Sequence, residues 1–181
     1  MRLTLTHHGD GVVTTDDGIR AVYDIANDEA SFGAASVAGP ALVWEVHAGD
    51  PSPEALLSAE VTLDPSQEWL LRCDRIDFPP GGIAHRHTHP GPGIRCQLSG
   101  ELTVETEGRS ATYGALGAWF ETGPDPVYAV AGGNEESAFV RVMLLPSEWE
   151  RKRTIRYVDP ADADKPKTQR ATVFFDRSIE L

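Results

Sequence analysis

The sequence predicts an all-β fold of the sandwich or barrel class, and two observations indicate it. Many short β-prone runs are separated by Gly, Pro and Asp residues, a spacing typical of antiparallel sandwiches and barrels. Helix signals, in contrast, are sparse. They are confined to Ser52-Pro53 ahead of the segment EALLSAE and to the capping-box spacing of Ser147 and Glu150. We therefore expect many strands and one or two short helices.

The expected strands are justified by their runs of β-branched, aromatic and aliphatic residues. Residues 1–40 carry only weak strand signals. Residues 99–114 predict a hairpin that turns at Glu107-Gly108, because Leu102 and Val104 alternate with polar residues on its first strand. The other strand-like runs lie at 41–49, 69–78, 93–100, 118–123, 127–133, 138–146 and 171–176.

Length and spacing indicate a single domain. A chain of 181 residues and 19.6 kDa is long enough to bury one substantial core. We place this core at about residues 69–145, with N-terminal strands at 1–68 and a C-terminal extension at 146–181. The two cysteines, Cys73 and Cys96, lie far apart without CxxC spacing, which predicts reduced buried thiols rather than a disulfide.

The charge balance disfavours some classes of partner. The chain carries a net charge of −12 and has a pI of about 4.8, so we expect no nucleic-acid partner. No apolar run approaches the roughly 20 residues that span a bilayer, and the first residues lack the apolar core of a secretion signal. We therefore expect no membrane partner and a cytoplasmic location.

Positive charge is concentrated in the tail. Residues 150–181 hold eight Lys or Arg, including all three lysines, and six Asp or Glu, which gives +2 against −14 for residues 1–149. The tail also contains the strand-like runs TIRYV and ATVFFD. We expect the tail to be ordered and to dock on the acidic body, with ATVFFD pairing with an exposed sheet edge. The alternative is a solvated extension.

The segment GIAHRHTH places three of the chain's six histidines at every second position. On an extended strand this spacing would put His85, His87 and His89 on one face. Imidazoles at i and i+2 can direct their nitrogens at one centre, which suits a divalent metal ion such as Zn, Fe, Ni or Mn. The alternative is a set of surface or hydrogen-bonded histidines.

The surroundings of these histidines resemble the first motif of the cupin superfamily, G-x5-HxH-x3,4-E-x6-G. The position of the metal-binding glutamate falls on Gly93. The resemblance covers residues 76–105 well and continues more loosely to about residue 145. It implies a small jelly-roll barrel, open at one end, with the histidines facing its cavity. The motif residues that fall in register are Gly81, His87, His89 and Gly100.

The second cupin motif, G-x5-P-x-G-x2-H-x3-N, resembles this sequence only in part. Gly117, the turn TGPDP and Asn134 match it, but its histidine position falls on Val127 or Tyr128. No histidine follows His89 anywhere in the chain. A site of the usual three-His, one-Glu type is therefore excluded.

Two chemistries remain open for such a site. In the first, His87 and His89 bind a divalent metal ion that serves an oxygenase, lyase or isomerase. The groups that would complete its shell are His85, Glu121, Gln97, Tyr128 and water, with Glu121 the most natural carboxylate. In the second, no metal is bound, and a cavity histidine acts as base with Tyr128 as acid, as the resemblance to cupin-fold epimerases implies. A noncatalytic module that binds a small ligand is the third hypothesis.

The expected ligand is a small organic acid or a similar polar metabolite. Arg95 and Gln97 share the strand parity of Gly93 and should face the cavity, where the guanidinium would hold a carboxylate or phosphate. The alternative for Arg95 is a buried ion pair with Glu121 or Asp125. A homodimer is expected as well, because the sheet edges of an open barrel need covering.

Overall fold

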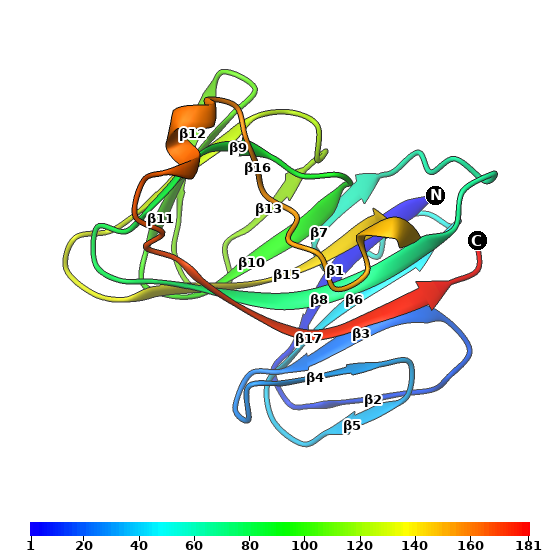
Figure 1. Cartoon of the computed structure of the whole chain (residues 1–181). Coiled ribbons are helices and arrows are strands. Elements are labelled where there is room, and N and C mark those ends of the chain that lie inside the picture. Colours follow the sequence, from blue (N-terminus) through cyan, green and yellow to red (C-terminus); the bar gives the residue numbers. More distant parts are fainter.

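The computed structural model describes residues 1–181, and three five-stranded antiparallel sheets form most of it (Figure 1). We call them the N-terminal, central and distal sheets. The N-terminal sheet has the spatial order β4 (Glu29–Phe32), β3 (Ile19–Asp24), β6 (Ala41–His47), β1 (Arg2–His8) and β7 (Ala55–Glu60). The central sheet has the order β13 (Ala118–Glu121), β10 (Gly93–Ser99), β15 (Ser137–Pro146), β8 (Trp69–Phe78) and β17 (Arg170–Ile179).

The distal sheet has the order β12 (Arg109–Tyr113), β11 (Leu102–Thr106), β14 (Val127–Ala131), β9 (Ile83–Thr88) and β16 (Arg156–Tyr157). A two-stranded sheet pairs β2 (Val12–Thr14) with β5 (Ala35–Val37). Two short 3-10 helices, η1 (Ser147–Trp149) and η2 (Pro160–Ala163), lie in the C-terminal segment. No helix is both long and apolar enough to cross a membrane. The predicted all-β class with very few helices is confirmed.

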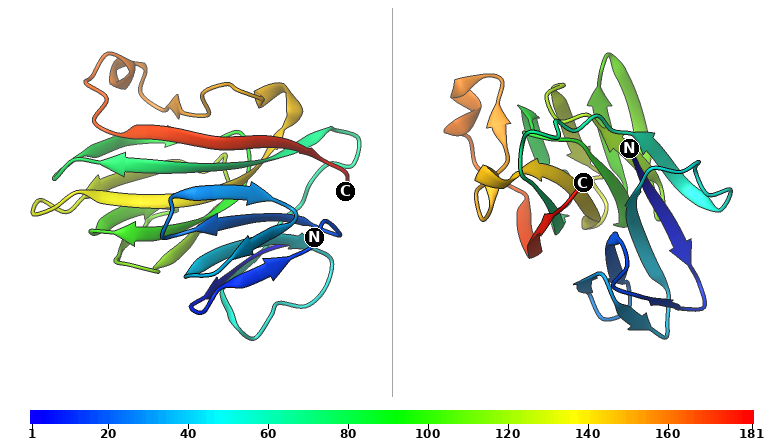
Figure 2. Two further views of the ribbon diagram at one scale, coloured as in Figure 1. Left: turned by 90° about the horizontal axis from the view of Figure 1, so that it is seen from below. Right: turned by 90° about the vertical axis from the view of Figure 1, so that its right-hand side faces the viewer.

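The central sheet lies in the middle of three layers and separates two clusters of buried side chains (Figure 2). Along β15, Val140 and Val142 belong to the cluster shared with the N-terminal sheet, whereas Phe139 belongs to the cluster shared with the distal sheet. Because successive residues point to opposite faces and both faces are covered, β15 has an almost continuous apolar sequence. The central and distal sheets together form the β-sandwich expected of a jelly roll.

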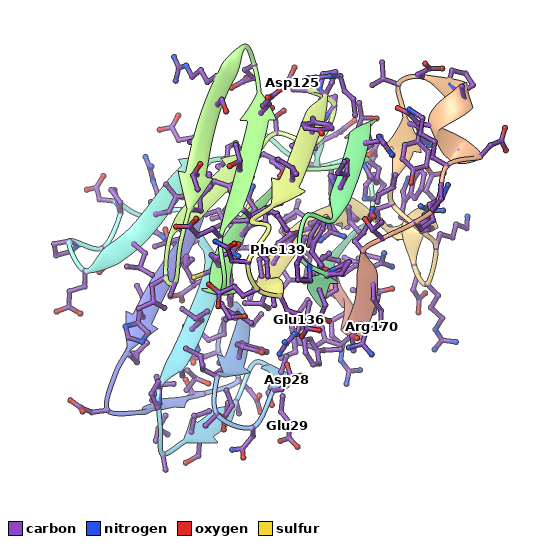
Figure 3. All side chains as sticks on the ribbon, turned by 90° about the vertical axis from the view of Figure 1, so that its left-hand side faces the viewer. Asp28, Glu29, Asp125, Glu136, Phe139 and Arg170 are labelled. Carbon is purple, nitrogen blue, oxygen red and sulfur yellow. The ribbon has the colours of Figure 1, made fainter.

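Two further contacts fasten the N-terminal sheet to the central one. The indole N–H of Trp44 donates a hydrogen bond to the carbonyl oxygen of Ile94 at 3.1 Å, in the buried interior. Arg75 of β8 contacts Asp28, in the turn between β3 and β4, at 3.2 Å; Asp28 is labelled in Figure 3. The N-terminal and central sheets therefore share one cluster of buried side chains.

The predicted hairpin is confirmed. β11 and β12 pair in register around Glu107-Gly108, and both turn residues have positive φ, 49° and 71°. These values are those of a type I′ turn, whose twist matches that of the flanking strands. Leu102 and Val104 are buried, as their alternation predicts. The two cysteines are free and buried, also as predicted.

The helix expected at EALLSAE is wrong, because Ala55–Glu60 forms β7 and pairs with β1. A helix of seven residues has little stability of its own, whereas the edge of β1 offers backbone partners. At the second site, Ser147–Trp149 does form one turn of 3-10 helix, but no side chain caps its start.

The tail lies against both sheets of the sandwich. β17 pairs with β8 at the edge of the central sheet, and β16 pairs with β9 at the edge of the distal sheet. The expectation that ATVFFD pairs with a sheet edge is thus confirmed. The tail is fixed by an ion pair of Arg72 with Asp176, in which two guanidinium nitrogens each lie 2.6 Å from a carboxylate oxygen.

Candidate functional site

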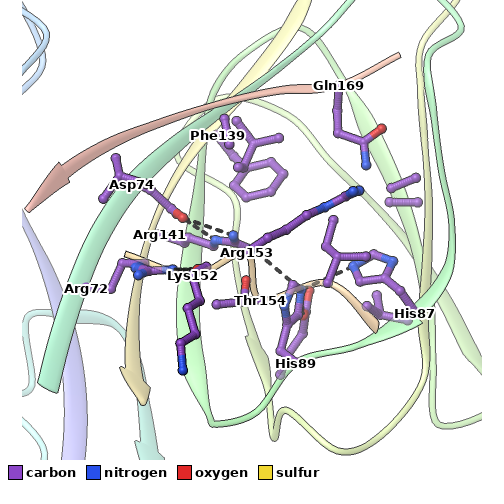
Figure 4. Close-up of a pocket in the computed structure, with 18 of the residues that line it drawn as sticks. Arg72, Asp74, His87, His89, Phe139, Arg141, Lys152, Arg153, Thr154 and Gln169 are labelled. Carbon is purple, nitrogen blue, oxygen red and sulfur yellow. Dashed lines mark hydrogen bonds and ion pairs between the residues drawn. The ribbon is translucent and has the colours of Figure 1, made fainter. Parts of the chain in front are cut away.

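A cavity of about 770 Å³ lies between the central and distal sheets (Figure 4). Fourteen of its 28 lining residues are hydrophobic, and ten of the other fourteen are charged. The tail completes its wall through residues 150–155 and through several residues between 167 and 176. The C-terminal extension is therefore part of the cavity and not an appendage to it.

A β-bulge in β9 decides which histidines face the cavity. Val127 of β14 lies opposite His87 and Ala129 lies opposite Ala84, so three steps along β9 match two steps along β14. Both Ala84 and His87 line the cavity, which shows that the regular alternation is broken between them. The side chain of His85 does not line the cavity, and only its backbone carbonyl contacts His87. The expected row of three histidines is corrected to a pair.

His87 and His89 both line the cavity, and their Nε2 atoms approach to 3.1 Å. Nδ1 of His87 lies 2.7 Å from the carbonyl oxygen of His85 and must donate to it, which leaves a lone pair on Nε2. Nη1 of Arg141 can only donate, and it lies 3.3 Å from Nε2 of His89, which must therefore accept. Two lone pairs thus point into one small space.

Burial keeps both imidazoles neutral. It lowers the pKa of His87, and together with the nearby charge of Arg141 it lowers the pKa of His89 well below its ordinary value. Since Nε2 of His89 accepts, its Nδ1 carries the proton and is a buried N–H without a hydrogen-bond partner. A neutral imidazole with its lone pair on Nε2 is a form that can bind a metal ion.

Glu121 lies at the cavity directly opposite Gly93, the position of the missing cupin glutamate. Residues paired across antiparallel strands share a face, so its carboxylate lies beside the space into which a side chain at Gly93 would project. No side chain fits at Gly93 itself, because a Cβ would lie 2.4 Å from the carbonyl oxygen of Val142. Glu121 accepts a hydrogen bond from the Trp119 indole at 2.9 Å, and its Oε2 lies 3.8 Å from Nε2 of His89.

Arg95 and Gln97 face inward, as their parity predicts, but both are completely buried and neither lines the cavity. Nη2 of Arg95 lies 2.7 Å from Oε2 of Glu121. This contact is an ion pair without an aligned hydrogen bond, because neither atom has a hydrogen-bond partner. Burial lowers the pKa of Arg95 to about 10, and the guanidinium stays charged at neutral pH. Gln97 donates to Ser137 at 2.7 Å. This placement gives the expected ligand contact of Arg95 and Gln97 no support.

The position of the second-motif histidine is filled by Val127, which lines the cavity opposite His87. Tyr128, the next residue, points to the other face of the distal sheet, where the guanidinium of Arg86 lies 6.0 Å from its ring centroid. Tyr128 therefore lies on the wrong side of β14 to act as an acid on a ligand in the cavity. That expectation is corrected.

We call the part of the cavity formed by His87, His89, Arg141 and Asp74 its polar end. The two charged residues of this set were not identified from the sequence. Arg141 of β15 forms a bidentate pair with Asp74 of β8, with contacts of 2.6 and 3.0 Å, and both residues are buried. Burial disfavours the charge of Arg141, but Asp74 outweighs this effect, so the pKa of Arg141 is raised. The available signal was a charged residue inside an apolar run, in FVRVML and in LLRCDRI.

No protein-family model matches the sequence, and a search of curated proteins finds no match. Solved structures similar to this chain include proteins described as cupins. An oxalate oxidase in complex with the substrate analogue glycolate is 22% identical, with 53% of this chain and 52% of that chain covered and a TM-score of 0.43.

Two further structures show likenesses of similar extent. The polyketide cyclase RemF from Streptomyces resistomycificus is 20% identical, with 52% of this chain and 63% of that chain covered and a TM-score of 0.40. An RmlC-like cupin from Shewanella frigidimarina is 16% identical, with 50% of this chain and 94% of that chain covered and a TM-score of 0.39. The chain spans about half the length of the oxalate oxidases it matches. These likenesses concern the fold of about half of this chain and not its chemistry.

Proposed function

We propose that this protein binds an organic acid in the cavity and holds a divalent metal ion at His87 and His89, where the ligand is activated. The observation that carries the proposal is the pair of Nε2 atoms 3.1 Å apart. Two nitrogens that each lie roughly 2.1 Å from one ion, at neighbouring coordination positions, are separated by about this distance. A cation between them would also relieve the repulsion of two facing lone pairs.

The carboxylate of Glu121 supports the same assignment. Its Oε2 is buried without a hydrogen-bond partner and is the nearest acidic oxygen to the histidine pair. As they stand, no three His, Cys, Asp or Glu side chains are close enough together to hold a metal ion. Binding therefore requires Glu121 to shift from Arg95 toward the histidines, and the Arg141 contact with His89 to give way.

Two histidines and one carboxylate would leave several coordination positions open, as catalytic sites require. A bound divalent ion supplies Lewis-acid polarisation of a ligand oxygen. Of this chain's own residues, His87 and His89 would hold the ion, Arg141 would orient the ligand's negative charge, and the apolar wall would exclude water. The metal-free alternative with Tyr128 as acid has no supporting observation.

Metal analysis of the protein, purified without chelator or affinity tag, tests the proposal. We expect about one divalent ion per chain in the wild type, and none after replacement of His87 and His89 by Ala. The matched control is His8→Ala, which removes a histidine that contacts Thr6 at the surface of the N-terminal sheet. Full occupancy in the double variant would contradict the proposal. So would a wild type that takes up none of Zn, Fe, Ni or Mn.

Glu121→Gln tests the third ligand separately. Gln keeps the shape of the Glu121 side chain but removes its negative charge. This variant should retain the metal ion less well at neutral pH, because an amide oxygen is a poorer ligand than a carboxylate. The measurement is competition with a chromophoric chelator. Unchanged retention would restrict Glu121 to its ion pair with Arg95 and its hydrogen bond from Trp119.

A further inference from the structure

The size and lining of the cavity narrow the class of ligand. A volume of about 770 Å³ lies within the range of roughly 300–1,000 Å³ that is typical of sites for drug-sized molecules. An acid of two or three carbons would leave most of this space and most of its apolar wall in contact with water. That wall is built by large side chains from both sheets, among them Phe78, Phe139, Trp119 and Leu102. A ligand that fills it needs an apolar body of ring-system size.

The polar end of the cavity is suited to an anion. Nε and Nη2 of Arg141 are engaged by Asp74, whereas Nη1 makes only the 3.3 Å contact with His89. The N–H groups of Nη1 are therefore the part of this buried guanidinium that remains for a ligand. A guanidinium edge in an apolar site favours a carboxylate strongly, because charge-assisted hydrogen bonds are strong where water is excluded.

The net charge of the residues that line the cavity also favours an anionic ligand. Six Lys or Arg and four Asp or Glu line the cavity, an excess of two positive charges in a chain whose net charge is −12. Four of these six cations come from the tail: Arg151, Lys152, Arg153 and Lys167. The Arg151 side chain is 89% exposed, and Arg153 and Lys167 lie against Tyr157, so the tail places its positive charge at the solvent-facing rim of the cavity, where it would attract an anion from solution.

We infer that the ligand is an amphiphilic carboxylate, with its acid group at Arg141 and a ring-sized apolar body against Phe139 and Trp119. This inference rests on the proposed function in one respect, that the cavity is the ligand site. It replaces the small polar acid expected from the sequence by a larger apolar one. The acid contact also moves from Arg95 to Arg141.

Isothermal titration calorimetry with three probes tests the inference on the protein as purified. The probes are 2-naphthoate, 2-naphthalenemethanol, which lacks the charge, and acetate, which lacks the body. We expect 2-naphthoate to bind at least about tenfold more tightly than either, since one charge-assisted hydrogen bond in a buried site supplies that much. Equal affinity for the neutral probe, or for acetate, would overturn the inference.

Two variants and one control locate the binding. Ala129→Phe fills the cavity from β14 and should weaken 2-naphthoate by at least about tenfold. Val130→Phe, the next residue on β14, faces away from the cavity and should leave binding unchanged. Arg141→Lys keeps a positive charge beside Asp74 but loses the planar fork, so the preference for 2-naphthoate over the alcohol should fall toward parity. Unchanged binding in Ala129→Phe would overturn the inference even if the Arg141 variant failed to fold.

Metal content measured on the same preparations separates the two proposals. Binding of 2-naphthoate by a protein that holds no metal ion would overturn the metal proposal and support the ligand class. A protein that holds one ion at the histidine pair but discriminates none of the three probes would overturn the ligand class alone.

Discussion

Replacing Asp176 by Asn tests how firmly the tail closes the cavity. The carboxylate receives two guanidinium nitrogens of Arg72 at 2.6 Å each and the backbone N–H of Arg151 at 2.7 Å. The side chains of the ion pair are only 3% and 6% exposed. Asn keeps the shape, but it removes the charge and turns one acceptor into a donor that faces other donors. Since breaking a buried pair costs about 3–5 kcal/mol and Asn retains one acceptor, we expect a loss of about 3 kcal/mol.

Urea unfolding followed by tryptophan fluorescence measures this loss of unfolding free energy. The matched control is Glu60→Gln, because its ion pair with Arg2 is also short, 2.9 Å, but its side chain is 82% exposed. An exposed pair contributes at most about 1 kcal/mol. A loss in Asp176→Asn no larger than in the control would refute the reasoning, and the tail would then be held by β17 pairing and packing alone.

Two further predictions concern pH and backbone packing. Burial would raise the pKa of Asp176, but hydrogen bonds from Arg72 and Arg151 outweigh it and hold the pKa below its ordinary value. The stability it contributes is therefore complete above its unfolded pKa of about 3.9 and is lost as pH falls through the folded pKa. The melting temperature should accordingly fall less between about pH 5 and about pH 3 in Asp176→Asn than in the wild type. An equal fall in the two proteins would contradict this prediction. Gly93→Ala should lower the free energy of unfolding by about 1–3 kcal/mol, because its Cβ would meet the Val142 carbonyl. The control Gly114→Ala, whose Cβ would lie in open space, should lower it by under about 0.5 kcal/mol. Equal losses for the two variants in urea unfolding would contradict the reasoning.

The sequence by itself determined the features that depend on neighbours along the chain. Strand alternation identified the inward faces around Leu102 and Arg95, and Glu107-Gly108 identified a turn that only positive φ can form. The HxH pair was found for the same reason, because residues two apart in extended backbone share a face, and His89 lies directly after the end of β9. The apolar runs of the tail indicated that it pairs with an edge, as β17 does with β8.

Tertiary structure decided what depends on partner strands. The bulge that turns His85 away from the cavity arises from the pairing of β9 with β14, which GIAHRHTH does not encode locally. The segment EALLSAE becomes a strand because β1 offers it an edge, against its own helical propensity.

The chemistry of the site follows the same division. Arg141 is accommodated in the interior only because register places Asp74 beside it, and Glu121 lies 3.8 Å from His89 because register places it opposite Gly93 at the cavity. A charge within an apolar run signals that a partner must exist, since an isolated buried charge is too costly. Which residue serves as that partner is decided by strand register, and register is a property of the assembled sheets.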